Sequence, residues 1–314
     1  MGDPRISVVI PTYNSRHFVG RAITSSLGQT LPPAEIIVID DGSTDGTREF
    51  IQKEFGDRVV YLYQDNQGEG AARNAGIQAS SGEWLSFLDA DDWWVPEKLE
   101  LQMAQIEKYP TASMVACGAS YCSLDGEEMS QIHLPKPFTA RTIREGLKLH
   151  SIFPVSTLVR REVFDRVGGF AEGLPLGADR EMWARVAAQY EVVGVDEPLL
   201  KITDHPASMS SDPERIIYYG PVVNRKVLKT LGSSSTVERL KDRLILRKAD
   251  AEMYQSAAYL YIQRGEDVRA AQNVIRSLSR WPMPRARVYR LALRMCMRLA
   301  MGGFKSIGSR EQIR

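Results

Sequence analysis

The chain has 314 residues, of which 43% are hydrophobic and 25% charged, and its formal net charge is +1. This is the composition of an ordinary globular protein with room for a sizeable core, and the near-zero net charge argues against a chain-wide nucleic-acid binder. No apolar run approaches the roughly 20 residues that a membrane span needs, and the first residues show no signal peptide pattern. Together with three cysteines that lack metal-ligand spacing, these features favour a cytoplasmic protein.

The first third of the chain alternates between strand and helix patterns. Short apolar runs predict buried strands at residues 6–10, 35–39, 59–63 and 84–88. Helical spacing of apolar residues predicts helices at residues 16–27 and 71–79. Such alternation with short connections is typical of a parallel sheet covered by helices on both faces. Polar motifs follow the strand ends, which is where open α/β sheets bind ligands.

The rest of the chain has a different texture. Short apolar runs at residues 112–119, 156–159 and 192–195 indicate an α+β second half that completes the sheet. From about Asp212 the pattern is helical throughout. Two helices are predicted at residues 237–264 and 268–279, joined by a turn at Gly265-Glu266-Asp267.

Three carboxylates stand at the end of the fourth apolar run. Asp89, Asp91 and Asp92 crowd together directly after the predicted strand at residues 84–88. Carboxylates beside a core carry a desolvation cost, which a divalent cation commonly offsets. The cluster therefore predicts a metal and phosphate site.

Four motifs at successive strand and helix ends closely resemble one family when they are taken together. They are Pro11-Thr12-Tyr13-Asn14, Asp40-Asp41-Gly42-Ser43-Thr44-Asp45, Ala72-Arg73-Asn74-Ala75-Gly76 and Asp89-Ala90-Asp91-Asp92. The chain resembles the family 2 glycosyltransferases, inverting enzymes of the GT-A fold, from about Ile6 to Ser210. The resemblance implies an α/β fold whose mostly parallel central sheet is flanked by helices, followed by a C-terminal helical appendage. We expect a nucleotide-sugar-binding half at residues 1–110, an acceptor-binding and catalytic half at 111–215 and a helical region at 216–314.

The resemblance also implies a metal-assisted donor site. A nucleotide-sugar donor carries a diphosphate that is also the leaving group, so positive charge is needed where negative charge develops. A Mn²⁺ or Mg²⁺ ion held by carboxylates and phosphate oxygens supplies it. By similarity, Asp91 is the expected metal ligand, and Asp89 lies near the donor ribose or the water shell of the metal. His205 is the expected second metal ligand, whereas Asp92 has the alternative role of capping a helix entered through residues 93–96.

Other donor contacts follow from the same resemblance. Asp41 is expected to accept a hydrogen bond from the imide N–H of uracil, which favours UDP-sugars; the alternative is an Asx turn leading into a helix. Pro11, Thr12 and Tyr13 are expected along the base-binding edge, with Tyr13 stacking on uracil. Arg73 is expected to meet phosphate at a helix N-terminus, and the alternative is a surface arginine without that contact.

The proton acceptor is expected in the second half. An inverting transfer is a single displacement, in which a carboxylate takes the proton of the acceptor hydroxyl. Asp179 matches the second residue of the family's Glu-Asp pair, although Ala178 replaces the usual Glu. Glu181 is the reserve candidate, and a helix N-cap is the structural alternative for Asp179.

The sequence thus predicts a hexosyl- or N-acetylhexosaminyl-transferase that moves a single sugar from a UDP-sugar to a saccharide or lipid-linked acceptor, in surface polysaccharide or glycoconjugate biosynthesis. A non-catalytic nucleotide-sugar-binding scaffold is the alternative, followed by a nucleotidyltransferase.

The stretch from Arg280 to Arg314 holds nine Lys or Arg and a single acidic residue, Glu311. It indicates a basic amphipathic helix that either contacts an anionic membrane at the inner face or packs on the protein. Nucleic-acid binding is not expected.

Overall fold

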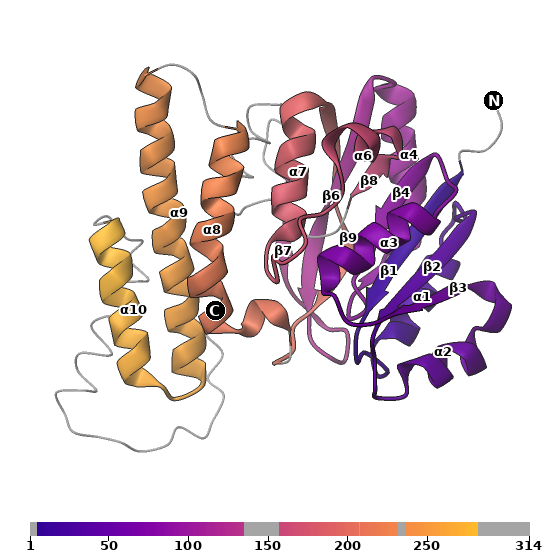
Figure 1. The fold of residues 1–314 in the computed structure, drawn as a ribbon, viewed down its shortest axis with the longest axis horizontal. Helices are drawn as coiled ribbons and strands as arrows, with labels where there is room; N and C mark the ends of the chain where they lie inside the picture. Colours follow the sequence, from indigo (N-terminus) through magenta and orange to yellow (C-terminus); the bar gives the residue numbers. More distant parts are fainter. Residues whose placement is uncertain (1–4, 135–156, 207, 232–235, 282–314) are drawn as a thin grey trace. The chain divides into compact units, whose positions relative to one another are not determined.

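The computed structural model describes residues 5–134, 157–206, 208–231 and 236–281 (Figure 1). The chain divides into two compact units, residues 1–206 together with 226–232, and residues 207–225 together with 233–314. The first unit is built on a sheet and the second on helices. Much of the predicted basic tail, residues 282–314, lies outside the described residues.

A single nine-stranded sheet forms the centre of the first unit in the described residues. Its strands run in the order β3-β2-β1-β4-β8-β6-β9-β5, and β7 pairs with β6. The strands are β1 (Ile6–Thr12), β2 (Glu35–Asp41), β3 (Val60–Gln64), β4 (Trp84–Phe87), β5 (Trp93–Trp94), β6 (Ala112–Cys122), β7 (Glu128–Ile132), β8 (Leu158–Arg160) and β9 (Glu191–Thr203). The sheet is mixed: β3, β2, β1 and β4 are parallel as predicted, whereas β8 runs antiparallel to both β4 and β6.

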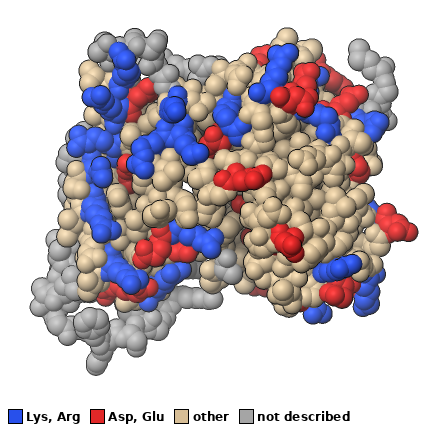
Figure 2. Space-filling model, viewed as in Figure 1, with Lys and Arg blue, Asp and Glu red and all other residues tan. Residues whose placement is uncertain are grey.

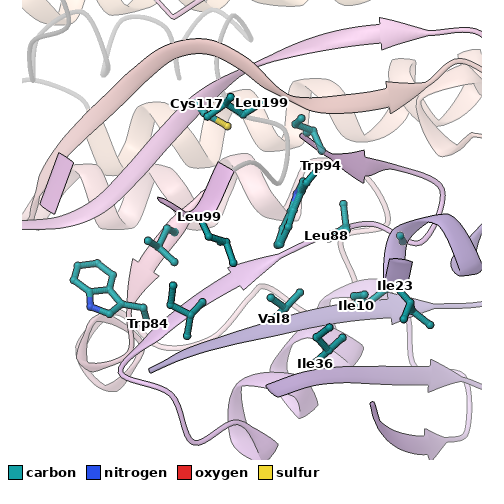
Figure 3. Close-up of a cluster of buried hydrophobic side chains, with 14 of the residues drawn as sticks. Val8, Ile10, Ile23, Ile36, Trp84, Leu88, Trp94, Leu99, Cys117 and Leu199 are labelled. Atoms are coloured by element: carbon teal, nitrogen blue, oxygen red, sulfur yellow. The ribbon is translucent and has the colours of Figure 1, made fainter. Parts of the chain in front are cut away.

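Helices cover both faces of the parallel part of the sheet. Side chains alternate between faces along a strand, so Val8 and Ile10 of β1 point to one face and Val9 to the other. Val8 and Ile10 join Ile23 in the main core, which Figure 3 shows together with Leu88 and Trp94. On the opposite face, a Cβ added to Gly76 would lie 2.2 Å from Val9 Cγ1, so only glycine allows this close helix–strand approach. The helices of this unit are α1 (Val19–Leu27), α2 (Thr47–Glu54), α3 (Glu69–Ala79), α4 (Lys98–Lys108), α6 (Glu162–Val167) and α7 (Ala178–Gln189), with a short 3₁₀ turn, η1 (Gly56–Arg58).

The second unit is a helical hairpin with a third helix. It contains η2 (Met209–Ser211), most of α8 (Pro213–Leu231), α9 (Thr236–Gln263) and α10 (Asp267–Arg280). The predicted turn between the last two helices is confirmed at Gly265, whose φ of +74° favours glycine. Tyr261 and Ala270 pack across this hairpin in a small core of their own. None of the helices in the described ranges is long and apolar enough to cross a membrane.

Candidate active site

The acidic turn, residues Asp89–Asp92, follows β4 directly. The amide of Asp92 donates to the carbonyl of Asp89 over 3.1 Å and closes the turn. Since β4 is parallel to β1, and β1 to β2, the carboxyl ends of these three strands meet at one edge of the sheet. The structure therefore places the acidic turn at the edge where the sequence motifs predicted a ligand site.

Asp91 and His205 meet although 114 residues separate them in the sequence. Asp91 Oδ2 lies 3.0 Å from His205 Nε2. His205 comes two residues after the end of β9, and its ring stacks on Phe18 with the centroids 4.7 Å apart. The imidazole is buried, whereas 31% of the Asp91 side chain remains exposed. The two predicted metal ligands are thus neighbours at an accessible position.

This pair fits a hard cation that is only partly bound by protein. Carboxylate oxygen and neutral imidazole nitrogen are donors that Mn²⁺ accepts, and Mg²⁺ favours oxygen together with water and substrate phosphate. Across the described ranges, no group of three His, Cys, Asp or Glu side chains is arranged to hold a metal ion. The remaining coordination positions would therefore be filled by water and by phosphate oxygens of a donor.

Arg73 lies beneath the acidic turn with only 1% of its surface exposed. Its Nη2 donates to Asp89 Oδ1 over 2.7 Å and also pairs with Glu69 Oε1, one helical turn earlier on α3. Its guanidinium also lies over the ring of Phe170, 5.3 Å from the centroid. Arg73 therefore binds two carboxylates of the site, and its contact with phosphate stays a prediction.

Three carboxylates, those of Glu69, Asp89 and Asp179, attract Arg73. Burial, and repulsion from Asp89, Asp179 and Asp91, together outweigh the attraction of Arg73 and raise the pKa of Glu69 to about 7. Burial also raises the pKa of Asp89, again against the attraction of Arg73. Negative charge thus exceeds positive charge at this edge, which is the condition that favours a bound cation.

Asp179 lies in the first turn of α7, whose N-cap is Gly177. The N-cap alternative for Asp179 is therefore wrong. It lies close enough to Glu69 and Asp89 to raise the pKa values of both. Asp179 is partly exposed and accepts no hydrogen bond from the described residues, and its role as proton acceptor stays a prediction.

Glu181, the reserve candidate for the proton acceptor, forms an ion pair with Arg185. Its Oε2 lies 3.0 Å from Arg185 Nη2, and the same nitrogen donates to the carbonyl of Gly169 over 2.6 Å. Asn74 fixes the neighbouring residue, because its Oδ1 accepts the amide of Phe170 over 2.7 Å. Glu181 therefore pairs with Arg185, which holds the loop before α7, and Asn74 of α3 binds the same loop.

The carboxylates at the end of β2 are bound by nearby chain. Asp41 accepts the Gln64 side-chain amide and the Gln67 backbone amide at Oδ1, over 2.7 and 2.9 Å, and the Gly68 amide at Oδ2 over 2.8 Å. A carboxylate offers about four acceptor positions, so one position on Asp41 remains for a base. Asp40 accepts the Ser43 amide over 2.8 Å and the Tyr61 hydroxyl over 2.6 Å.

The loop after β1 carries the other predicted donor contacts. Pro11 and Thr12 are buried at the end of β1, and Thr12 Oγ1 has no hydrogen-bond partner among the described residues. Tyr13 is 51% exposed and free to stack on a planar ligand. Asn14, with φ of +48°, accepts the Thr44 amide over 2.8 Å and so joins this loop to the loop after β2.

Asp92 does not cap a helix. Residues 93 and 94 form β5, which pairs with β9, and α4 begins only at Lys98. Asp92 Oδ1 instead accepts the backbone amide of Thr203 over 2.9 Å. Burial, followed by repulsion from Asp91 and Asp89, raises the pKa of Asp92 well above its ordinary value. Asp92 therefore ties the acidic turn to the end of β9.

Sequence reasoning missed four residues of the site. Phe18, Arg21 and Thr203 contact His205 or the acidic turn from distant parts of the chain, and no local pattern announces such contacts. Glu69 did carry a signal, because Glu and Arg four residues apart on a helix commonly pair.

Solved structures share this architecture. TarS residues 1–349 from S. aureus, in complex with UDP-GlcNAc, aligns with a TM-score of 0.60 and 17% identity, covering 96% of this chain and 93% of that one. A mannosyltransferase from Pyrobaculum calidifontis, in complex with GDP-Man and Mn²⁺, aligns with a TM-score of 0.58 and 19% identity over 95% and 81% of the two chains. Both likenesses confirm the predicted GT-A fold.

Sequence relatives point to the same class of protein. A glycosyltransferase of Rickettsia prowazekii, itself uncharacterised, is 26% identical over 96% of this chain and 88% of its own length. A Bacillus subtilis protein named as a putative teichuronic acid biosynthesis glycosyltransferase is 35% identical over 51% of this chain and 63% of its own length. The sequence profile of Glycosyl transferase family 2 matches residues 7–168, which is more than half of the chain and includes the carboxyl ends of β1, β2 and β4. This chain therefore belongs to the family 2 glycosyltransferases.

Proposed function

We propose that the protein is an inverting, metal-dependent glycosyltransferase that moves one sugar from a UDP-sugar to a hydroxyl of a saccharide or lipid-linked acceptor. The observation that carries this proposal is the meeting of Asp91 with His205 at 3.0 Å, beside Asp89 and with Asp179 near enough to act on its charge. One side of the site offers ligands to a cation and the other offers a base. A single displacement needs both.

The nucleotide-sugar donor binds to residues at the carboxyl ends of β1, β2 and β4. Tyr13 stacks on the uracil ring beside Pro11 and Thr12, and Asp41 accepts the imide N–H at its remaining position. Asp89 accepts hydrogen bonds from donor hydroxyls while Arg73 holds it in place from below. Exposed Tyr13 and partly exposed Asp89 support these roles.

The diphosphate would lie at Asp91 and His205. These residues would hold a Mn²⁺ or Mg²⁺ ion, which supplies positive charge to the leaving diphosphate when bound. Asp179 takes the proton of the acceptor hydroxyl as its oxygen bonds to the anomeric carbon and the bond from that carbon to the diphosphate oxygen breaks. The inverted configuration follows from this one displacement.

The Asp179→Asn variant tests the base directly. We expect UDP binding to stay within about twofold of wild type, while turnover falls by about a hundredfold or more because a general base contributes 10²–10⁴-fold. The control is Glu107→Gln, which removes an exposed carboxylate on α4, and it should leave both quantities unchanged. The donor for this assay comes from a thermal-shift screen of nucleotide sugars with Mn²⁺.

Near-normal sugar transfer by the Asp179→Asn variant would show that another residue is the general base. The same assay without acceptor separates an enzyme from a non-catalytic scaffold. Slow metal-dependent release of UDP indicates an enzyme. If no donor in the screen releases UDP, the result supports a non-catalytic binding protein. The nucleotidyltransferase alternative is disfavoured because residues 11–14 after β1 contain no Gly, Lys or Arg for a phosphate loop.

We further propose a role in surface polysaccharide or glycoconjugate synthesis, with a hexose or N-acetylhexosamine as the transferred sugar. The relative named for teichuronic acid biosynthesis and the fold neighbour solved with UDP-GlcNAc support this assignment. UDP-GlcNAc is therefore the first donor to assay.

Peripheral contact with an anionic membrane at the cytoplasmic face is part of the same proposal. Figure 2 shows Lys and Arg side chains gathered over the α9–α10 part of the molecule, and Arg269, Arg276 and Arg280 are exposed on α10. Removing residues 281–314 should reduce co-sedimentation with vesicles of anionic lipid and leave zwitterionic vesicles unaffected, because basic residues add about 1 kcal/mol each near an anionic surface. Equal co-sedimentation of the truncated and full-length proteins with anionic vesicles would contradict the proposed membrane contact.

A further inference from the structure

The main-chain carbonyl of Asp91 is held by two side chains from elsewhere in the fold. The Thr203 hydroxyl, at the end of β9, donates to this oxygen. Arg21 of α1 donates through Nη2 to Thr203 Oγ1 over 2.6 Å and reaches the Asp91 carbonyl over 3.5 Å. One hydroxyl therefore accepts from Arg21 and donates to Asp91, so the three groups form a continuous chain.

The same elements hold His205. The backbone amide of Thr203 donates to Asp92, so both ends of Thr203 are bound to the acidic turn. His205 follows two residues later, and its ring lies against Phe18, which immediately precedes α1. The start of α1 thus contacts the Asp91 side through Arg21 and the His205 side through Phe18.

Arg21 is itself fixed in place. Its guanidinium lies over the ring of Trp93, 3.6 Å from the centroid, in the strand that follows the acidic turn. A cation–π contact of this kind restrains the direction of the guanidinium fork. Arg21 is partly buried, so its hydrogen bonds to Thr203 and Asp91 compete only weakly with water.

The charge of Arg21 opposes the binding of a cation nearby, because like charges repel. Its hydrogen bonds act in the other direction, since they hold Asp91 in register with His205. These two effects on metal affinity have opposite signs, so an experiment can tell them apart.

We propose that Arg21 is a positioning residue which, through Thr203, fixes the Asp91 backbone so that its carboxylate stays within reach of His205 for cation binding. This inference rests on the proposed metal-dependent function. Groups that orient metal ligands commonly contribute 10–100-fold to metal affinity. The contacts of Arg21 and Thr203 are more than structural, because they set the distance between the metal ligands Asp91 and His205.

The test measures the Kd of Mn²⁺ for the full-length protein saturated with UDP, using the electron paramagnetic resonance signal of free Mn²⁺. We expect Arg21→Met and Thr203→Val to raise this Kd about tenfold or more. Thr203→Ser keeps the hydroxyl and should bind as wild type does. Arg16→Met removes an exposed arginine from the loop before α1 and is the control for lost charge. UDP affinity without metal should be unchanged in all four variants.

Each outcome has a defined meaning. A lower Kd in Arg21→Met, with Thr203→Val unchanged, would show that Arg21 acts only through its charge and would overturn the inference. If Arg21→Met fails to fold, the Val and Ser variants of Thr203 decide the question by themselves. Wild-type protein that binds no Mn²⁺ would contradict the proposed function as well. Mn²⁺ binding that is lost in Asp91→Asn but retained in Arg21→Met and Thr203→Val would contradict this inference alone.

Discussion

Two parallel strands of the sheet, β2 and β4, which lie on either side of β1, both lead into acidic pairs, but the surroundings of these pairs differ. At the end of β2, Asp40 and Asp41 are buried and accept hydrogen bonds from residues no more than 27 positions away. After β4, Asp89 and Asp91 stay partly exposed and meet Arg73 and His205. The end of β2 therefore keeps one acceptor position open on Asp41, whereas the carboxylates after β4 keep a larger accessible surface. What distinguishes the two ends is how many acceptor positions the protein leaves unfilled.

Within the acidic turn, Asp91 and Asp92 also differ in their surroundings. Asp92 resembles the β2 carboxylates, because it is buried and bound to a backbone amide. Asp91, one residue earlier, has its carboxylate beside an imidazole and open to solvent. Adjacent carboxylates thus serve structure and ligand binding separately.

The largest expected effect on stability concerns Lys98 of α4, which is fully buried against β4. Its Nζ donates to Ser86 Oγ of β4 over 3.0 Å and to Gln102 Oε1 over 2.8 Å, and it forms no ion pair with an acid in the described ranges. Burial lowers the pKa of Lys98 from 10.5 to about 8. The folded protein therefore releases this proton at lower pH than the unfolded chain does.

The sign of the pH effect follows from this difference. Below about pH 8 the cost of burying the charge is present in full, and it disappears as the pH rises towards 10.5. Between these values, the free energy of unfolding of wild type should gain about 3 kcal/mol relative to Lys98→Met, measured by urea unfolding at each pH. Parallel pH profiles of the two proteins would show that folding does not lower the pKa of Lys98, which would contradict this prediction.

A smaller effect is expected at the end of β2. Asp40→Ala should lower the free energy of unfolding by about 2 kcal/mol, because the Ser43 amide and the Tyr61 hydroxyl lose their acceptor. Asp91→Ala should lower it by about 1 kcal/mol or less, because it removes only the side-chain contact with His205 and relieves repulsion on Asp92. Chemical denaturation of both variants at one pH makes this measurement. Equal losses would mean that the acidic turn is as structural as the end of β2.

Much of the fold could be predicted because its signals are local. The apolar runs that form β1, β2, β4 and β6 are interrupted by polar motifs where the strands end, and the helices α9 and α10 meet at a glycine. The antiparallel insertion of β8 between β4 and β6 could not be predicted, because strand pairing depends on contacts between residues far apart in sequence.

The site was predictable to the same extent. The sequence indicated Asp91 and His205 through motifs, and the structure brings them together. It did not indicate the partner of Asp92, because a carboxylate near a helix start and one bound to a distant strand look alike in sequence. Arg21 and Thr203 were missed for the same reason: their contacts with the acidic turn span 70 and 112 residues.

The most direct test of the central claim is calorimetric titration of UDP into wild type and Asp91→Asn, each with and without Mn²⁺. If Asp91 is the open carboxylate that binds the metal with His205, Mn²⁺ should raise UDP affinity at least about tenfold in wild type and leave it unchanged in Asp91→Asn. Glu107→Gln should behave as wild type. An equal gain from Mn²⁺ in wild type and Asp91→Asn would contradict the account.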